Sequence, residues 1–415
     1  MNLLIKKSIL LLVLLLPETN SRSVVTLSDT PTLLIEVNSN DNDYQDAVAF
    51  VSLPDYINVR QPFTLIDTHS ERAIPFQISE NSAQSTNELW FIVNDYLPSD
   101  SIRHYALYPG NPVESRSMLL ESDGSAVRLK KNGHLILQYN HAHVTPPAGI
   151  KSVFTRSGYI HPVYSPSGLL VTEDFPDNHR HHKGVWFPWT QTEYMGQVID
   201  FWNLGKKEGT VQFAGFNTIH SGSVFVGFSA SHEHVRFDEY HVEPVLLETW
   251  DVRAWNTSEA YHMWDLNSYQ RTASESPLKL LEYRYGGLGF RGSRYWSDDN
   301  HIILTSEGHT KENGNGQPAR WVAQSGEIVN GQTATVIIMS HPENYSHPEP
   351  IRIWESGGSF FNYAPVQLGE RVLEPDTVYP FRYRFIVHDG DIDPDLAERM
   401  WQQYANPIVT RIVPD

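Results

Sequence analysis

Residues 159–205 read YIHPVYSPSGLLVTEDFPDNHRHHKGVWFPWTQTEYMGQVIDFWNLG, and this stretch concentrates imidazole and indole side chains. An imidazole can carry a proton near neutral pH or ligate a metal. An indole offers a flat apolar face with one hydrogen-bond donor. The stretch therefore predicts the floor of a ligand site. The side chains concerned are His161, His179, His181, His182, Trp186, Trp189 and Trp202.

The rest of the chain predicts an all-β fold. Short runs of branched and aromatic residues recur along it, with Gly, Asn and Pro between them, and no helical periodicity separates them before residue 390. Aromatic residues make up 12% of the chain, which also favours strands. This pattern is typical of antiparallel sandwiches. Clear strand-like runs are 33–37, 47–51, 89–93, 135–139, 224–228, 245–250, 335–339 and 383–387.

Segments rich in turn-forming residues mark the expected domain boundaries. We expect a signal peptide at 1–23, an N-terminal β-sandwich domain at 30–112, a large antiparallel β-supersandwich at 120–390, and a C-terminal helix with a tail at 391–415. Asp393 can cap the helix and Pro394 suits its first position. Leu396, Met400 and Tyr404 then fall on one helical face.

Composition excludes some classes of function. The formal charge is −18, which argues against nucleic acid, because phosphates need a basic surface. Cysteine is absent, so disulfides and thiolate sites are excluded. Lys6 and Lys7 precede a short apolar run, which predicts a secretory signal and a periplasmic or secreted bacterial protein. No later apolar run is long enough for a membrane span.

The segment NHRHHKG leaves three interpretations open. On a strand, His179 and His181 would share one face and His182 would take the other. A shared face could bind a divalent metal with Asp174 or Glu173 as third ligand, although no HExxH helix is present and we expect no cofactor. Alternatively, His181 or His182 could act as general acid and base beside a carboxylate. The histidines could also only complete the hydrogen bonds of turns.

Carboxylates that could assist these histidines lie downstream. In ETWDVR, strand alternation puts Glu248 on the face opposite Asp251 and Arg253. Asp265 follows in HMWD. Either Glu248 or Asp265 could act as a base or orient an imidazole, although charged pairs on a sheet face often have no catalytic role.

Arginines could bind an anionic group. Arg291 lies beside the glycine-rich turn YGGLGF, which is not the GxGxxG loop of a nucleotide site. A guanidinium fork binds carboxylate or sulfate in bidentate fashion. Arg291 and Arg320 could therefore form an anion pocket for a uronic acid or a sulfated sugar, or could only form surface ion pairs.

Aromatic residues and a late loop are further candidates. Trp186, Trp189 and Trp202 could be core residues or a platform for a sugar ring. His341 and Asn344, in HPENYSHP, could order the edge of a site or simply form a turn.

Several ordered motifs resemble an uncharacterised bacterial family labelled PmoA-like, or methane-oxygenase-like. They lie at 159–162, 178–187, 200–202, 285–291, 319–321 and 341–344. The resemblance implies a β-supersandwich similar to galactose mutarotase and a secreted, sugar-degrading context. Asn178 stands where the family often has Asp, and Lys183 where it has Arg or His. The oxygenase label does not fit, since a membrane subunit needs spanning helices.

Together these features predict a secreted carbohydrate-active enzyme that cleaves a glycosidic linkage, as a glycoside hydrolase or a polysaccharide lyase, on an anionic oligosaccharide. His181 or His182 would be the acid and base, with Glu248 or Asp265 assisting. A sugar mutarotase or epimerase and a non-catalytic glycan-binding protein stay open as alternatives. Substrate contacts would come from His161, His179, Trp186, Trp189, Trp202, Arg291, Arg320, His341 and Asn344.

Overall fold

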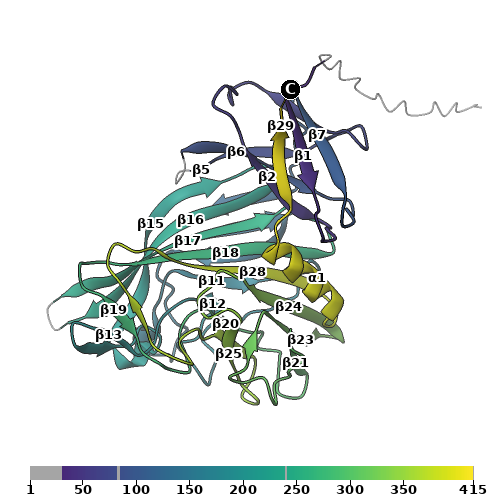
Figure 1. The fold of residues 1–415 in the computed structure, drawn as a ribbon. Coiled ribbons are helices and arrows are strands. Elements are labelled where there is room, and N and C mark those ends of the chain that lie inside the picture. The colour runs from purple at the N-terminus through teal and green to yellow at the C-terminus, as the bar shows by residue number, and fades with distance from the viewer. Residues whose placement is uncertain (1–29, 82–84, 239–240, 415) are drawn as a thin grey trace, which may run out of the picture.

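The computed structural model describes residues 30–81, 85–238 and 241–414, and the expected signal peptide lies outside them. Figure 1 shows a small β-sandwich standing on a larger one. Strands dominate, and the only α-helix of the described residues is α1 (Pro394–Ala405). The all-β prediction with one C-terminal helix is therefore confirmed. No helix in the described part of the chain is long and apolar enough to cross a membrane.

The small sandwich packs a five-stranded sheet, in the order β29-β1-β7-β3-β4, on a three-stranded sheet, β2-β6-β5. Ile35, Leu65, Leu89, Phe91 and Leu107 are fully buried between the two sheets. The strands are β1 (Leu33–Asn38), β2 (Ala47–Ser52), β3 (Phe63–Asp67), β4 (Arg72–Ile74), β5 (Phe76–Asn81), β6 (Thr86–Val93), β7 (Ile102–Pro109) and β29 (Val409–Val413).

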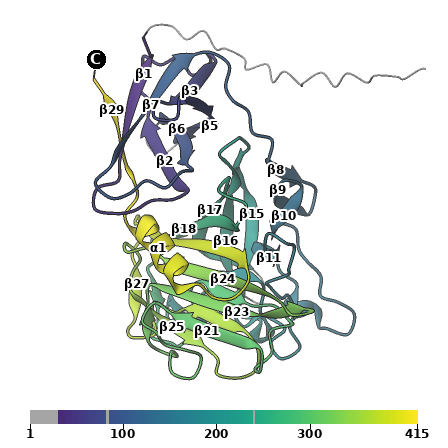
Figure 2. The same cartoon turned by 90° about the vertical axis from the view of Figure 1, so that its right-hand side faces the viewer.

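The C-terminal segment belongs to this small sandwich. The sequence predicts only a tail after the helix, because 409–413 is a run of only five residues at the end of the chain. In the structure β29 pairs antiparallel with β1, and Ile412 lies opposite Ile35. Figure 2 shows β29 beside β1, so the two ends of the described chain meet in one sheet.

In the large sandwich a nine-stranded sheet packs face to face on an eight-stranded sheet. The nine strands lie in the order β22-β25-β26-β20-β12-β11-β10-β9-β8, and the eight strands in the order β15-β16-β17-β18-β28-β24-β23-β21. The nine strands are β8 (Met118–Ser122), β9 (Ala126–Lys131), β10 (His134–Asn140), β11 (Tyr159–Val163), β12 (Val185–Trp186), β20 (Gly289–Arg291), β22 (Pro318–Ala319), β25 (Glu349–Ile353) and β26 (Phe360–Tyr363). The eight strands are β15 (Gly209–His220), β16 (Phe225–Phe237), β17 (Val242–Trp255), β18 (Tyr261–Thr272), β21 (His301–Thr305), β23 (Trp321–Val329), β24 (Gln332–Ser340) and β28 (Tyr379–Asp389).

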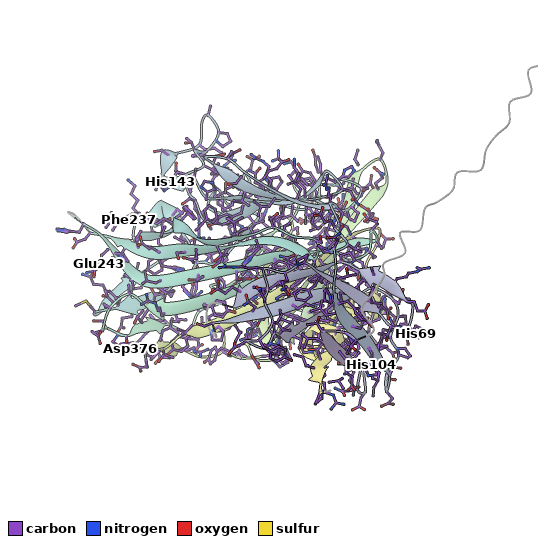
Figure 3. The ribbon with its side chains drawn as sticks, turned by 90° about the horizontal axis from the view of Figure 1, so that it is seen from above. His69, His104, His143, Phe237, Glu243 and Asp376 are labelled. Atoms are coloured by element: carbon purple, nitrogen blue, oxygen red, sulfur yellow. The ribbon has the colours of Figure 1, made fainter. Side chains whose placement is uncertain are left out.

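A four-stranded sheet completes the large sandwich at one end. Its strands are β13 (Thr192–Tyr194), β14 (Gln197–Ile199), β19 (Leu278–Leu280) and β27 (Arg371–Leu373). The short helices η1 (Ser152–Phe154) and η2 (Leu204–Lys206) lie in loops. Figure 3 places Phe237 and Glu243, which flank the turn between β16 and β17, at the end of the molecule away from His69 and His104 of the small sandwich.

The two faces of the eight-stranded sheet have different neighbours. Along β17, Trp250 and Val252 belong to the main core between the large sheets, whereas Asp251 and Arg253 point to the other side. This outer side carries α1 and the small sandwich. Because side chains alternate along a strand, neighbouring residues of one motif are separated by the full thickness of the sheet.

The helix α1 forms as predicted and packs on that outer side. The Asp393 carboxylate accepts a hydrogen bond from the backbone N–H of Leu396 at 3.0 Å, and Pro394 occupies the first turn. Met400, Trp401 and Tyr404 are buried against the sheet.

Candidate functional site

The histidine segment forms a turn and not a strand. The backbone N–H of His182 donates to the carbonyl of His179 at 2.8 Å. The rings of these two residues stack with centroids 4.8 Å apart, and the His181 ring lies edge-on to that of His182 at 4.7 Å. The prediction that His182 faces away from His179 and His181 is therefore wrong. Pro176 explains the turn, since its carbonyl accepts from the His179 N–H at 3.2 Å.

Aromatic rings surround this turn. His182 lies 5.1 Å from Trp186 and 4.9 Å from Phe360, and His179 lies 4.5 Å from Trp354. The sheet order β26-β20-β12 brings these distant parts of the chain together. We call the group the histidine–tryptophan cluster; it consists of His179, His181, His182, Trp186, Trp202, Trp354 and Phe360.

The three tryptophans proposed from the sequence do not form a platform. Trp186, Trp189 and Trp202 are 0%, 1% and 2% exposed, so no ligand can stack on them. Trp189 belongs to the main core, where its Nε1 donates to Gln270 Oε1 at 2.8 Å. Trp186 and Trp202 pack together with ring centroids 4.9 Å apart, and Trp186 packs against the ring of His182.

Trp354 and Tyr285 are the half-buried aromatic residues of the site, and the sequence did not single them out. Trp354 Nε1 donates to the Tyr285 hydroxyl at 3.4 Å. Two glycines with positive φ, Gly357 and Gly358, follow Trp354 and shape its loop. The WESGG motif was the one signal that could have indicated a tight loop carrying a half-buried indole.

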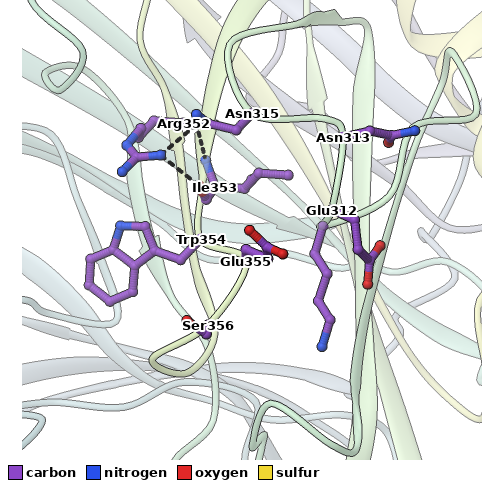
Figure 4. Close-up of a pocket in the computed structure, with 9 residues that line it drawn as sticks. Glu312, Asn313, Asn315, Arg352, Ile353, Trp354, Glu355 and Ser356 are labelled. Atoms are coloured by element: carbon purple, nitrogen blue, oxygen red, sulfur yellow. Dashed lines mark hydrogen bonds between the residues drawn. The ribbon is translucent and has the colours of Figure 1, made fainter.

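A cavity of about 450 Å³ opens beside Trp354, between the loops 311–315 and 352–356. Figure 4 shows Arg352 held on one side, where it donates to Asn315 Oδ1 at 2.6 Å and to the Ile353 carbonyl at 2.9 Å. Arg352 also donates to the Tyr285 hydroxyl at 3.3 Å. Trp354 is thus one of the residues that line this mostly polar pocket, and its ring packs on His179 and Phe360 of the histidine–tryptophan cluster.

The histidines of the cluster are neutral at pH 7. Burial lowers the pKa of His181 to about 4 and lowers the pKa of His182 well below its usual value. Burial and the nearby Arg291 also lower the pKa of His179. A neutral imidazole can donate and accept hydrogen bonds, but it has no extra proton to give. The general-acid role predicted for His181 or His182 therefore does not fit this environment.

A buried ionic group lies next to the cluster. Lys183 Nζ donates to Asp174 Oδ1 at 2.8 Å, and the Tyr159 hydroxyl donates to Asp174 Oδ2 at 2.6 Å. The ammonium also lies 3.1 Å from the centre of the Phe175 ring. Burial lowers the pKa of Lys183 to about 8, although Asp174 opposes the shift. These contacts fix the start of β12 under the histidine turn.

The metal interpretation lacks its third ligand. Asp174 is occupied by Lys183 and Tyr159, and Glu173 pairs with Arg291 at 3.3 Å. Within residues 30–81, 85–238 and 241–414, no three His, Asp or Glu side chains are grouped so that they could hold a metal.

Glu248 and Asp265 cannot serve the same histidine, because they lie on opposite faces of the eight-stranded sheet. Glu248 is 2% exposed in the core, where it accepts from Ser268 Oγ at 2.5 Å and Gln270 Nε2 at 3.0 Å. His234 Nε2 also lies 3.0 Å from it. Burial alone would raise the pKa of Glu248, but these histidine contacts outweigh it and lower the pKa.

Asp265 lies on the outer face, paired with Arg384 at 2.7 and 2.9 Å. Neither Glu248 nor Asp265 has a hydrogen bond with His181 or His182, so their predicted assisting role is corrected. The prediction that Glu248 faces away from Asp251 and Arg253 is confirmed.

A fully buried arginine was missed by the sequence analysis. Arg156 is 1% exposed, and none of its three side-chain nitrogens has a hydrogen-bond partner among the described residues. Burial lowers its pKa to about 10, whereas the charges of Glu248, Tyr159 and Asp174 oppose that shift. The guanidinium therefore brings a buried positive charge near Glu248 and Asp174, which favours its charged form.

Arg291 and Arg320 do not form one anion pocket. Arg291 is bound to Glu173 at 3.3 Å and to Asn178 Oδ1 at 3.1 Å. Arg320 pairs with Glu398 of α1 at 2.7 Å and lies 4.5 Å from the Trp401 ring. Since their carboxylate partners lie in different parts of the fold, the predicted pocket is wrong. The cations that line the observed pocket are Lys311 and Arg352.

The remaining candidates lie apart from the pocket. His161 Nδ1 is 2.9 Å from Thr172 Oγ1, and burial lowers the pKa of His161 to about 4. His341 packs edge-on to Tyr404 at 5.1 Å on the outer side of the eight-stranded sheet. Asn344 is buried and holds its turn by donating to Glu349 at 2.9 Å and to the Arg382 carbonyl at 2.8 Å. The predicted site-edge role of Asn344 is thus corrected, whereas His341 lines a cavity on the outer side of the sheet, away from Trp354.

A family model described as a family of unknown function (DUF6807) matches residues 126–402, which span most of the large sandwich and α1. That match does not test the PmoA-like label or the likeness to galactose mutarotase, which stay predictions. No curated protein matches the sequence.

Two solved structures resemble the fold at low similarity. One is a protein of glycosyl hydrolase family 38 from Enterococcus faecalis, with a TM-score of 0.46 and 11% identity over 92% of this chain. The other is an alpha-mannosidase from Enterococcus faecalis V583, with a TM-score of 0.47 and 11% identity. The chain spans about half their length, 47% and 46% respectively. At these values the likeness supports no statement about function.

Proposed function

Since the chain belongs to DUF6807, a family of unknown function, we propose its function from its own site: it is a carbohydrate-active protein that binds a saccharide against Trp354 and cleaves a glycosidic linkage there. The observation that carries this proposal is the half-buried indole in the wall of a polar pocket. A pyranose has an apolar ring face and a rim of hydroxyls, which suits such a wall and rim.

The pocket supplies both halves of that recognition. Its volume of about 450 Å³ suits one or two sugar units, since ligand sites span roughly 300–1,000 Å³. The amides of Asn313 and Asn315 can accept from and donate to hydroxyls. Lys311 and Arg352 bring positive charge to the same pocket, which favours the carboxylate or sulfate of an anionic sugar.

The pocket also contains a pair of carboxylates, Glu312 and Glu355, both exposed. Most glycosidases use two such groups, one to protonate the leaving oxygen and one to act as base or nucleophile. A hydrogen bond from Thr310 lowers the pKa of Glu312, which keeps it ionised. We assign Glu312 the base or nucleophile role and Glu355 the acid role. The neutral histidines position the wall that carries Trp354.

Non-catalytic glycan binding is the second candidate, and one observation favours it. His179 and His181 are neutral, and the Trp354 ring packs on His179. Among the groups near the pocket, the case for proton transfer therefore rests on Glu312 and Glu355 alone. A binding protein would keep its affinity without changing the sugar.

The test compares three variants on a panel of neutral and uronate oligosaccharides. Trp354→Ala should weaken binding at least about tenfold in calorimetry, which corresponds to about 1.4 kcal/mol. Glu312→Gln and Glu355→Gln should bind normally but lose at least about a hundredfold of the rate at which reducing ends appear. Tyr295→Ala, an exposed aromatic residue outside the pocket, serves as control. Unchanged affinity of Trp354→Ala would refute the site, and binding without any new reducing end would leave only the second candidate.

A further inference from the structure

A second and larger cavity lies between the two sandwiches. It has a volume of about 840 Å³ and covers the outer face of the eight-stranded sheet. Its walls come from β2 and β6 of the small sandwich, from β15 to β18 and β28, and from the end of α1. Figures 1 and 2 show the small sandwich standing over these strands. No residue of the histidine–tryptophan cluster lines this inter-domain groove.

The charges of the groove are already paired with one another. The pairs are Asp251 with Arg253 at 2.9 Å, Asp265 with Arg384 at 2.7 Å, and Glu343 with Arg382. A charged ligand would have to break such a pair and leave one partner uncompensated, which is most unfavourable for Asp265 and Arg384, whose side chains are both 11% exposed. Glu80 adds negative charge to the same walls, which disfavours an anionic ligand further. A neutral ligand can use the free lone pairs and N–H groups without breaking any pair.

Aromatic side chains supply the apolar part of the groove. Phe50 stacks on Trp90 with centroids 4.6 Å apart, and Phe50 is 41% exposed. Trp255 lies 5.6 Å from Trp90 on the sheet side. Flat rings at an exposed edge offer the kind of surface on which a sugar ring packs.

Two donors in the groove have no partner among the described residues. They are the Trp90 Nε1–H and the Tyr404 hydroxyl, both of which are buried atoms. Tyr404 itself is 8% exposed, and its ring packs against the Arg384 guanidinium at 4.6 Å. A buried donor without an acceptor is unfavourable, so a ligand hydroxyl that reaches either atom gains a hydrogen bond.

We propose that the inter-domain groove binds a neutral oligosaccharide, as a saccharide site separate from the pocket beside Trp354. Ring faces pack on Phe50 and Trp90, and hydroxyls bridge the paired charges and the two unpaired donors. The groove lies on the opposite face of the eight-stranded sheet from the histidine turn. Binding in the groove therefore does not require the pocket beside Trp354. A long glycan chain held there is retained near the protein while another part of it enters the pocket.

The experiment measures binding of neutral hexaoses with cellulose-, mannan-, xylan- and starch-type linkages, and of oligogalacturonate, by calorimetry. It starts from Trp354→Ala, so that the remaining affinity belongs to the groove. That protein should still bind at least one neutral hexaose. Asn267 of β18 lies opposite Asp251 and lines the groove, where its amide can hydrogen-bond a sugar hydroxyl. Adding Phe50→Ala or Asn267→Ala should then weaken this binding at least about tenfold. Tyr56→Ala, an aromatic residue of the small sandwich that is 73% exposed and outside the groove, is the matched control.

Each outcome decides the proposal. Retained binding that Phe50→Ala or Asn267→Ala removes and Tyr56→Ala preserves supports it. Loss of all neutral glycan binding in Trp354→Ala overturns it, as does a preference for oligogalacturonate in that background. Melting temperatures within about 2 °C of the parent show that a variant is folded. The proposed function is judged separately, from turnover by the protein with Trp354 intact.

Discussion

At the scale of single residues, the most constrained charge next to the candidate site is Lys183. Its side chain is 0% exposed, and Asp174, its partner at 2.8 Å, is 10% exposed. Removing one member of a buried pair leaves the other uncompensated, at a cost of about 3–5 kcal/mol. Lys183→Met should therefore lower the free energy of unfolding by about 3 kcal/mol in urea titrations. The pair of Lys279 and Glu193, with side chains 43% and 34% exposed, gives the control, because Lys279→Met should cost less than about 1 kcal/mol.

The double variant Asp174→Asn with Lys183→Met sharpens this test. Removing both charges should recover part of the lost stability, since no buried charge is then left alone. Equal effects of Lys183→Met and Lys279→Met would show that the buried pair contributes nothing special.

Residue identity alone located the histidine segment but not the surface that a ligand can reach. The composition of 178–184 indicated a site, and strand alternation placed Glu248 away from Asp251. Whether a tryptophan lines a pocket or is buried in the core depends on which other strands pack against it. Trp186 and Trp354 therefore could not be distinguished by sequence, although only Trp354 lines the pocket. Arg156 has no neighbouring pattern that would reveal its burial.

At the scale of elements, the last strand closes the small sandwich. β29 covers one edge of β1, and Arg411 pairs with Glu36 across that edge at 2.8 Å. Sequence patterns could not reveal this pairing, because the partners lie at opposite ends of the chain and no residue of β29 is fully buried. Uncovered strand edges pair with other chains.

Deleting residues 409–415 should therefore destabilise the small sandwich and promote association. We expect a lower melting temperature for the first calorimetric transition and a concentration-dependent oligomer in light scattering. Deleting only 414–415 is the control, since β29 ends at Val413. A monomer with an unchanged melting profile would mean that β29 does not protect the edge.

At the scale of the whole molecule, the eight-stranded sheet separates what the sequence suggested was one site. His181 lies with the nine-stranded sheet, Glu248 lies in the core between the sheets, and Asp265 and His341 lie on the outer side. The all-β character was predictable from periodicity, and each of the eight strand-like runs falls largely within a strand, but many of the shorter strands were not predicted. The faces of the sheet against which the small sandwich and α1 pack were not predictable, because they depend on contacts between residues hundreds of positions apart.

Buried titratable groups across the whole fold set opposite pH dependences. Burial lowers the pKa of His161, His181, His262 and His301 to about 4. The unfolded chain therefore binds more protons than the folded one between about pH 4 and 6.5, and each histidine makes the protein less stable as the pH falls through that range. Burial raises the pKa of Glu349 to about 7, so the folded state binds the extra proton there and this one group becomes stabilising as the pH falls.

The histidines should prevail, because each contributes about 2 kcal/mol between pH 7 and pH 5 and Glu349 offsets only about one of them. The free energy of unfolding, measured by urea titration at both pH values, should therefore be lower at pH 5. His262→Phe should reduce this difference, because it removes a buried imidazole whose two nitrogens have no partner among the described residues. Glu349→Gln should enlarge it, since the opposing group is lost. Equal stability at the two pH values, or changes of the same sign in both variants, would contradict the assignment of these buried groups.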